Sequence, residues 1–121
     1  MWLRFPLPTS SVLQYFDGTV GMIFVGLSEE VGFRFYLINL LLLRGMSRAS
    51  AIVVSTLIFA GSHWSYGAGA VVFAMLAGLV LSLIFTSTRN LIAPIITHAA
   101  YDAVYFAGGI AFLWRLCSCA W

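Results

Sequence analysis

Charged and imidazole side chains that fall within apolar stretches are the residues of this sequence most suited to chemistry. They comprise three of the four acids, both histidines and one arginine: Glu29, Glu30, Asp102, His63, His98 and Arg34. Charged groups inside a membrane helix are costly, so they usually pair with one another or line a functional cavity. These six residues therefore define the candidate site.

Helical spacing separates the two neighbouring glutamates. Glu30 and Arg34 are four positions apart, which predicts an ion pair on one helix face. Glu29 is rotated by about 100° from Glu30 and shares its face with Phe33, so it has no partner on its own helix. A buried carboxylate without an ion pair favours proton uptake, which suits a general base that takes a proton from water. We therefore expect chemistry from Glu29 and structural support from Glu30 and Arg34.

Helix length allows an estimate of the depth of the two histidines relative to Glu29. His98 and Asp102 are four apart on one face, and His63 follows Phe59 by four. At about 1.5 Å per residue, Glu29, His63 and Asp102 reach similar levels, with His98 one turn deeper. Histidines there can orient a water molecule or donate to an oxyanion. Alternatively, Glu29, His63 and His98 are candidate zinc ligands, although the His-Glu-x-x-His signature is absent.

Composition indicates the elements that must position these side chains. Hydrophobic residues make up 62% of the 121 residues and charged residues 8%, against about 25% charged in soluble domains. We therefore predict an all-α, polytopic transmembrane helix bundle of about four spans. The expected spans are Gly18–Leu43, Ala49–Trp64, Ala68–Phe85 and Leu91–Trp114. They form a core over residues 18–115, with an N-terminal segment 1–17 and a tail 116–121. The net charge of +2 without a basic block argues against nucleic-acid binding.

Small residues predict how the spans pack against one another. Small side chains recur every four positions in the third and fourth spans, at Ala70, Ala74, Gly78 and Ser82 and at Ala99, Ala103, Ala107 and Ala111. Such stripes let helix backbones approach closely in lipid.

The arginines predict how the spans are oriented in the membrane. Arg44, Arg48 and Arg89 place the first and third turns on one side, with Arg4 and Arg115 on the other. This excess favours both termini outside the cytoplasm.

Three short motifs resemble those of the CPBP family, the CAAX-protease and bacteriocin-processing membrane proteins also called Abi. Residues 29–34 read EEVGFR and are similar to the family's EExxxR motif. Residues 59–63 read FAGSH and match FxxxH, whereas residues 98–102 read HAAYD and resemble HxxxN with aspartate in the last place. The motifs occur in the family's order on separate predicted helices, and they cover most of the chain.

This resemblance implies a glutamic-type intramembrane endopeptidase that cleaves a membrane-associated protein or peptide. It implies that Glu29 activates the water with help from His63, and that His98 and Asp102 form the oxyanion site. The supporting residues are Glu30, Arg34 and Phe59. No cofactor is expected, and zinc is the alternative because the family was long described as metalloproteases. We expect an integral, multi-pass protein of the bacterial cytoplasmic membrane.

Two departures from the family pattern affect these expectations. Typical members have further helices before the first motif, so this chain is a minimal member, a fragment, or one part of an assembly with partner helices or a second copy. Asparagine can donate to an oxyanion, whereas an ionised Asp102 would repel it. Asp102 is therefore protonated, or accepts a hydrogen bond from His98, or impairs activity.

A different class of function also fits buried ion pairs. A non-catalytic membrane protein, such as an immunity factor or a transporter fragment, would use them for packing or for proton movement. Transporters commonly contain helices broken near the midplane. None of the predicted spans has an internal Gly-Pro break. This favours the enzyme.

Overall fold

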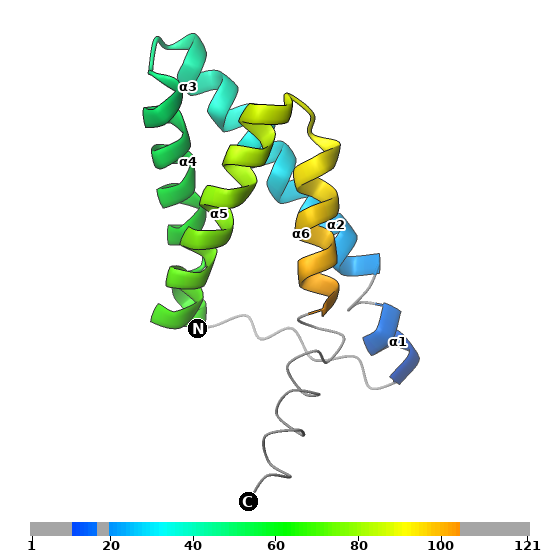
Figure 1. Cartoon of the computed structure of the whole chain (residues 1–121). Helices are drawn as coiled ribbons and strands as arrows, with labels where there is room; N and C mark the ends of the chain where they lie inside the picture. Colours follow the sequence, from blue (N-terminus) through cyan, green and yellow to red (C-terminus); the bar gives the residue numbers. More distant parts are fainter. Residues whose placement is uncertain (1–10, 17–19, 105–121) are drawn as a thin grey trace, which may run out of the picture.

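The regular structure of the chain is helical throughout the part described by the computed structural model, residues 11–16 and 20–104 (Figure 1). The α-helices are α1 (Ser11–Phe16), α2 (Met22–Glu29), α3 (Asn39–Leu43), α4 (Arg48–Ser62), α5 (Ala68–Thr88) and α6 (Ile92–Val104). A π-helix, η2 (Glu30–Ile38), joins α2 to α3 without a break, and a 3₁₀ turn, η3 (Trp64–Tyr66), follows α4. The predicted all-α class is confirmed for these residues.

Local sequence explains where the helices begin and end. Ser47 caps α4, because its hydroxyl accepts the backbone N–H three residues later at 3.1 Å. Gly67 precedes α5 with a φ of 97°, a conformation open to glycine. Arg89 ends α5 in the left-handed conformation, and the Asn90 side chain then accepts the backbone N–H of the first residue of α6 at 2.8 Å. These caps and turn residues produce short connections, so that successive helices fold back on one another.

The helices pack against one another as two pairs. Helix α4 lies beside α5, and α2 lies beside α6 (Figure 1). The α3–α4 turn and the α5–α6 linker lie at the same end of the bundle, at the top of Figure 1. This places Arg44, Arg48 and Arg89 together, as their positions in the sequence predicted. Arg4 and Arg115 lie outside the described residues.

The predicted stripe of small residues on α5 is an interface. Ala74, Gly78 and Ser82 are buried. A Cβ atom added at Gly78 would lie only 2.9 Å from Cδ1 of Phe59, so the α4–α5 contact requires a glycine here. This close approach also brings the backbone of α5 next to the candidate site.

The stripe on α6 faces α2. A Cβ atom at Gly26 would lie 3.3 Å from the backbone nitrogen of Ala99, which is tight van der Waals contact. Backbones that approach this closely allow side chains of α2 and α6 to meet across the interface. The last two members of the predicted stripe, Ala107 and Ala111, lie outside the described residues.

Among the described helices, α5 alone is long and apolar enough to cross a membrane. Its 21 residues rise about 30 Å, the thickness of a bilayer's hydrocarbon core. Helix α4 is apolar but has only 15 residues. The sequence prediction of about four spans is therefore supported for one helix, and the polytopic bundle stays a prediction.

The structure corrects the expectation of an ordinary α-helix over residues 18–43. Residues Glu30–Ile38 form a π-helix, with the wider turn of i→i+5 hydrogen bonds, and π-helical runs of this length are rare. Ser55 of α4, fully buried, donates to the backbone carbonyl of Phe33 at 2.9 Å. This bond anchors the middle of the π-helix to α4, and the same π-helix carries Glu30 and Arg34.

Candidate active site

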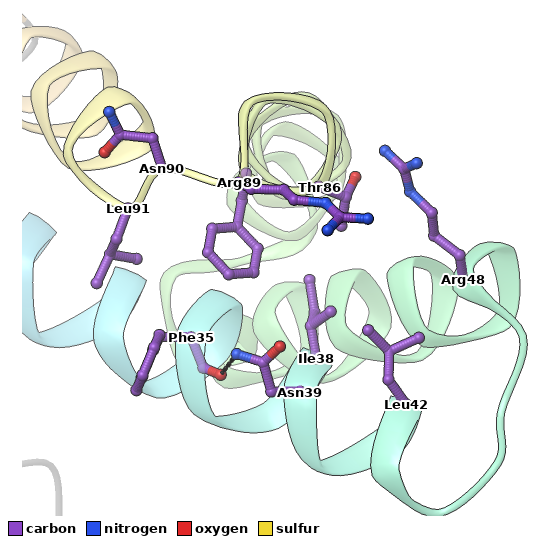
Figure 2. A pocket seen from close by; sticks show the side chains of 10 residues that line it. Phe35, Ile38, Asn39, Leu42, Arg48, Thr86, Arg89, Asn90 and Leu91 are labelled. Carbon is purple, nitrogen blue, oxygen red and sulfur yellow. Dashed lines mark hydrogen bonds between the residues drawn. The ribbon is translucent and has the colours of Figure 1, made fainter.

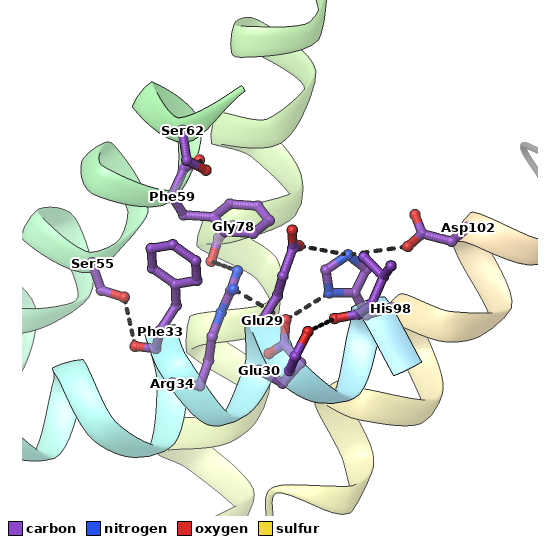
Figure 3. A network of polar contacts seen from close by, with 12 residues as sticks. Glu29, Glu30, Phe33, Arg34, Ser55, Phe59, Ser62, Gly78, His98 and Asp102 are labelled. Atoms are coloured by element: carbon purple, nitrogen blue, oxygen red, sulfur yellow. Dashed lines mark hydrogen bonds and ion pairs between the residues drawn. The ribbon is translucent and has the colours of Figure 1, made fainter. Parts of the chain in front are cut away.

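The imidazole of His98 lies at the centre of a buried polar network between α2, η2 and α6 (Figure 3). Its Nδ1 atom is 2.7 Å from Oε1 of Glu30. Its Nε2 atom is 3.5 Å from Oε2 of Glu29 and 3.5 Å from Oδ2 of Asp102. The structure thus brings Glu29, His98 and Asp102 together, whereas the depth estimate from the sequence had placed His63 at the level of Glu29 and Asp102 and His98 one turn deeper. The predicted proximity of His98 and Asp102 on one helix face is confirmed.

The Glu30–Arg34 ion pair predicted from spacing is confirmed. Nη1 of Arg34 lies 3.1 Å from Oε1 of Glu30, and both side chains are fully buried. The guanidinium carbon lies 4.2 Å from the ring centroid of Phe59, a cation–π contact. Nη2 of Arg34 donates to the carbonyl of Gly78 at 3.4 Å. Three helical segments therefore hold one cation in place.

Glu30 has a second contact that the sequence did not predict. It lies against His98 as well as Arg34, so it is more than the partner of a structural ion pair. A carboxylate can only accept, so Nδ1 of His98 carries the proton of this hydrogen bond. The bond fixes the ring so that Nε2 faces Glu29 and Asp102. No local signal could reveal a contact between residues 68 positions apart.

The arrangement around Nε2 of His98 is suited to a shared proton. With its proton on Nδ1, a neutral His98 would direct a lone pair at the carboxylates of Glu29 and Asp102, each 3.5 Å away. Two ionised carboxylates have no hydrogen to offer that lone pair. A proton on Nε2, on Glu29 or on Asp102 would make these contacts attractive.

His63 lies beyond the end of α4, whereas the sequence predicted a span that continued to Trp64. The helix ends at Ser62, whose hydroxyl donates to the carbonyl of Phe59 at 2.7 Å and so competes with backbone pairing. Nδ1 of His63 is 2.9 Å from the same carbonyl. His63 interacts electrostatically with Glu29 and Asp102 but forms no ion pair with either among the described residues.

Aromatic rings form one wall of the site. The Phe59 ring meets Phe33 edge to face at 5.1 Å between centroids and His98 at 5.9 Å. It also lies 4.8 Å from the ring of His63. Phe59, expected to support the site, thus contacts both histidines and Arg34. Sequence reasoning missed Ser55 and Gly78 as supports, although Gly78 belonged to the predicted small stripe.

The described residues do not assemble the zinc ligands considered from the sequence. Glu29 and His98 approach each other, but no three His, Cys, Asp or Glu side chains in ranges 11–16 and 20–104 could hold a metal ion together. His63 instead directs Nδ1 to the backbone of α4. The zinc-dependent reaction stays an alternative prediction.

Together these features define a class: over the described residues, a helical protein with a buried carboxylate–imidazole site and one helix apolar enough to span a membrane. The family model described as Type II CAAX prenyl endopeptidase Rce1-like matches residues 11–104. The chain belongs to this family, which is part of the CPBP family that its motifs resemble. No curated protein and no solved structure matches it. Membership implies a membrane-embedded protease of the CAAX type.

Proposed function

We propose that this chain is an intramembrane endopeptidase that cleaves a membrane-associated protein or peptide with a water molecule activated by Glu29. One observation carries the proposal beyond family membership. Glu29 and Asp102, from different helices, both lie 3.5 Å from the same nitrogen of His98. A base and an oxyanion donor must both reach one bound carbonyl group, so side chains gathered in one small region favour this role.

Glu29 is the proposed general base. As the water oxygen attacks the carbonyl carbon, Glu29 takes the proton and the carbonyl oxygen becomes an oxyanion. The C–N bond then breaks, and the proton passes from Glu29 to the leaving amine. The products are a carboxylic acid, which keeps the second proton of the water, and an amine.

His63 is proposed to orient the water. The carbonyl of Phe59 can only accept, so the contact at 2.9 Å requires a proton on Nδ1 of His63. In the neutral ring, Nε2 is then an acceptor for a hydrogen of water.

His98 and Asp102 are proposed to stabilise the oxyanion. Because Nδ1 donates to Glu30, Nε2 of His98 carries a hydrogen only when the imidazole is protonated on both nitrogens. A cation aimed at the developing oxyanion is an effective stabiliser in a site removed from bulk water. Asp102 supplies a second donor when its carboxyl group is protonated.

The activity can be tested with the purified full chain in lipid nanodiscs. A prenylated peptide with a CAAX terminus is the substrate probe, and the reaction is run in ¹⁸O-labelled water with empty nanodiscs as control. We expect one internal peptide bond to break, with one ¹⁸O atom in the new carboxylate. If the peptide stays intact, the proposal fails for this substrate class, and the non-catalytic alternative gains support.

A further inference from the structure

A cavity of about 860 Å³ lies at the end of the bundle that carries the arginines, apart from the His98 network (Figure 2). Its walls come from η2, α3, the start of α4, the end of α5 and the α5–α6 linker. None of the six polar residues of the candidate site lines it. Cavities of this size commonly hold small molecules. The catalytic proposal leaves this cavity without a role.

One side of the cavity is apolar and open. Phe35 is 54% exposed and Leu42 is 38% exposed, although both are large hydrophobic residues. The apolar lining continues inward through Ile38, Phe85 and Leu91. In a membrane-embedded protein, an exposed apolar surface of this kind is suited to a lipid acyl chain.

The rim of the cavity carries two arginines from different elements. Arg48 begins α4 and Arg89 ends α5, and Figure 2 shows both side chains extending over the same opening. Neither has an ion-pair partner among the described residues, whose three carboxylates all belong to the His98 network. Two planar guanidinium groups over one opening are suited to a phosphate.

Two asparagine side chains that line the cavity add one hydrogen-bond donor and one acceptor. Asn90 uses its side-chain oxygen to accept the backbone N–H of Ile92 at 2.8 Å, which leaves its amide NH₂ group available within the described structure. Asn39 uses its NH₂ group to donate to the carbonyl of Phe35 at 2.6 Å, which leaves its oxygen as an acceptor. The cavity thus offers a further donor to a phosphate and an acceptor to a hydroxyl group.

We propose that this cavity binds an anionic phospholipid. The headgroup phosphate lies between Arg48 and Arg89, and one acyl chain follows Phe35 and Leu42. Basic pockets between membrane helices bind anionic headgroups in this way. Because two cations line the rim, a headgroup that carries its own cation, such as choline, binds less well. The proposal does not depend on the catalytic roles given above.

The test compares phosphatidylglycerol with phosphatidylcholine on the purified full chain in detergent micelles. Native mass spectrometry reports bound lipid, and the midpoint of thermal unfolding reports stabilisation by binding. We expect phosphatidylglycerol to bind and to raise the midpoint more than phosphatidylcholine does. In the double variant R48Q/R89Q, affinity for phosphatidylglycerol should fall about tenfold or more, because two charge-assisted hydrogen bonds are lost.

Arg44 provides the matched control. It directly follows α3, in the turn at the same end of the bundle, but does not line the cavity, so R44Q should keep its preference for phosphatidylglycerol. A second variant, Asn90→Asp, keeps the oxygen that accepts the N–H of Ile92 but places an anion beside the phosphate, and should weaken binding. Circular dichroism without added lipid checks that each variant folds.

Three results would overturn the proposal. Equal stabilisation by the two lipids would show that charge recognition is absent. Equal losses in R44Q and in R48Q/R89Q would indicate general attraction to the arginine-rich end rather than a built site. Equal protection by inorganic phosphate alone would show that the acyl chain contributes nothing, and that the cavity is a site for a free anion.

Discussion

Glu30 and His98 lie 68 positions apart in the chain, yet their side chains meet at 2.7 Å between Oε1 and Nδ1. The same carboxylate oxygen lies 3.1 Å from Arg34. Glu30 therefore connects the cation buried between η2, α4 and α5 to the imidazole of α6. This relationship makes Glu30 a positioning residue for His98 as well as a partner of Arg34.

The Glu30→Gln variant should be strongly destabilised. Removing one charge of a buried pair leaves Arg34 without its carboxylate, a loss that typically costs about 3–5 kcal/mol. Equilibrium unfolding in detergent measures it. A cycle with R34Q and the double variant E30Q/R34Q should show that the double loss is smaller than the sum of the single losses. Additive losses would mean that the pair is not coupled.

The Gly78→Ala variant should destabilise the bundle by about 1–3 kcal/mol, the usual cost of overpacking. The new Cβ would lie 2.9 Å from Cδ1 of Phe59, so the ring must shift, and 3.5 Å from Nη2 of Arg34, which is ordinary van der Waals contact. Gly61→Ala is the matched control, because a Cβ there meets nothing within 4 Å. Thermal unfolding compares the two. Equal midpoints would contradict the close contact between α4 and α5.

Chelation should leave peptide cleavage unchanged. The proposed reaction uses Glu29 and imidazoles, and the described residues gather no three-ligand metal set. Activity after extensive dialysis against a chelator, together with the metal content per chain, provides the measurement. Stoichiometric zinc whose removal abolishes cleavage, and whose return restores it, would establish the zinc-dependent alternative.

The Asp102→Asn variant should remain active to higher pH than the wild type. Aspartic acid donates only in its protonated form, which is lost as pH rises, whereas the amide of asparagine donates at any pH. Rate–pH profiles of both proteins provide the comparison. An unchanged profile would mean that Asp102 only accepts a hydrogen bond from His98. An inactive but folded variant would mean that the carboxylate itself takes protons.

Periodicity in the sequence predicted contacts within a helix but not the distortion of the helix. The pairs Glu30–Arg34 and His98–Asp102 are each four residues apart, so spacing alone was enough to predict them. The π-helix was not predicted, and neither was the bond from Ser55 to the carbonyl of Phe33, which depends on how α4 packs.

Contacts between distant residues were also beyond sequence reasoning. Motif order placed Glu29 and His98 in one site, but the orientation of the imidazole depends on Glu30, which spacing assigned to Arg34 alone. His63 was expected within a helix. Instead, α4 ends one residue before His63, at Ser62. The side chains of Ser62 and His63 both contact the carbonyl of Phe59 there.

The most direct test of the proposed mechanism is the rate of peptide cleavage by Glu29→Gln in lipid nanodiscs. Glutamine keeps the size of the side chain but cannot take a proton from water, so we expect a loss of about 100-fold or more with unfolding unchanged. Full cleavage by folded Glu29→Gln would contradict the central claim, because the water would then be activated by another group.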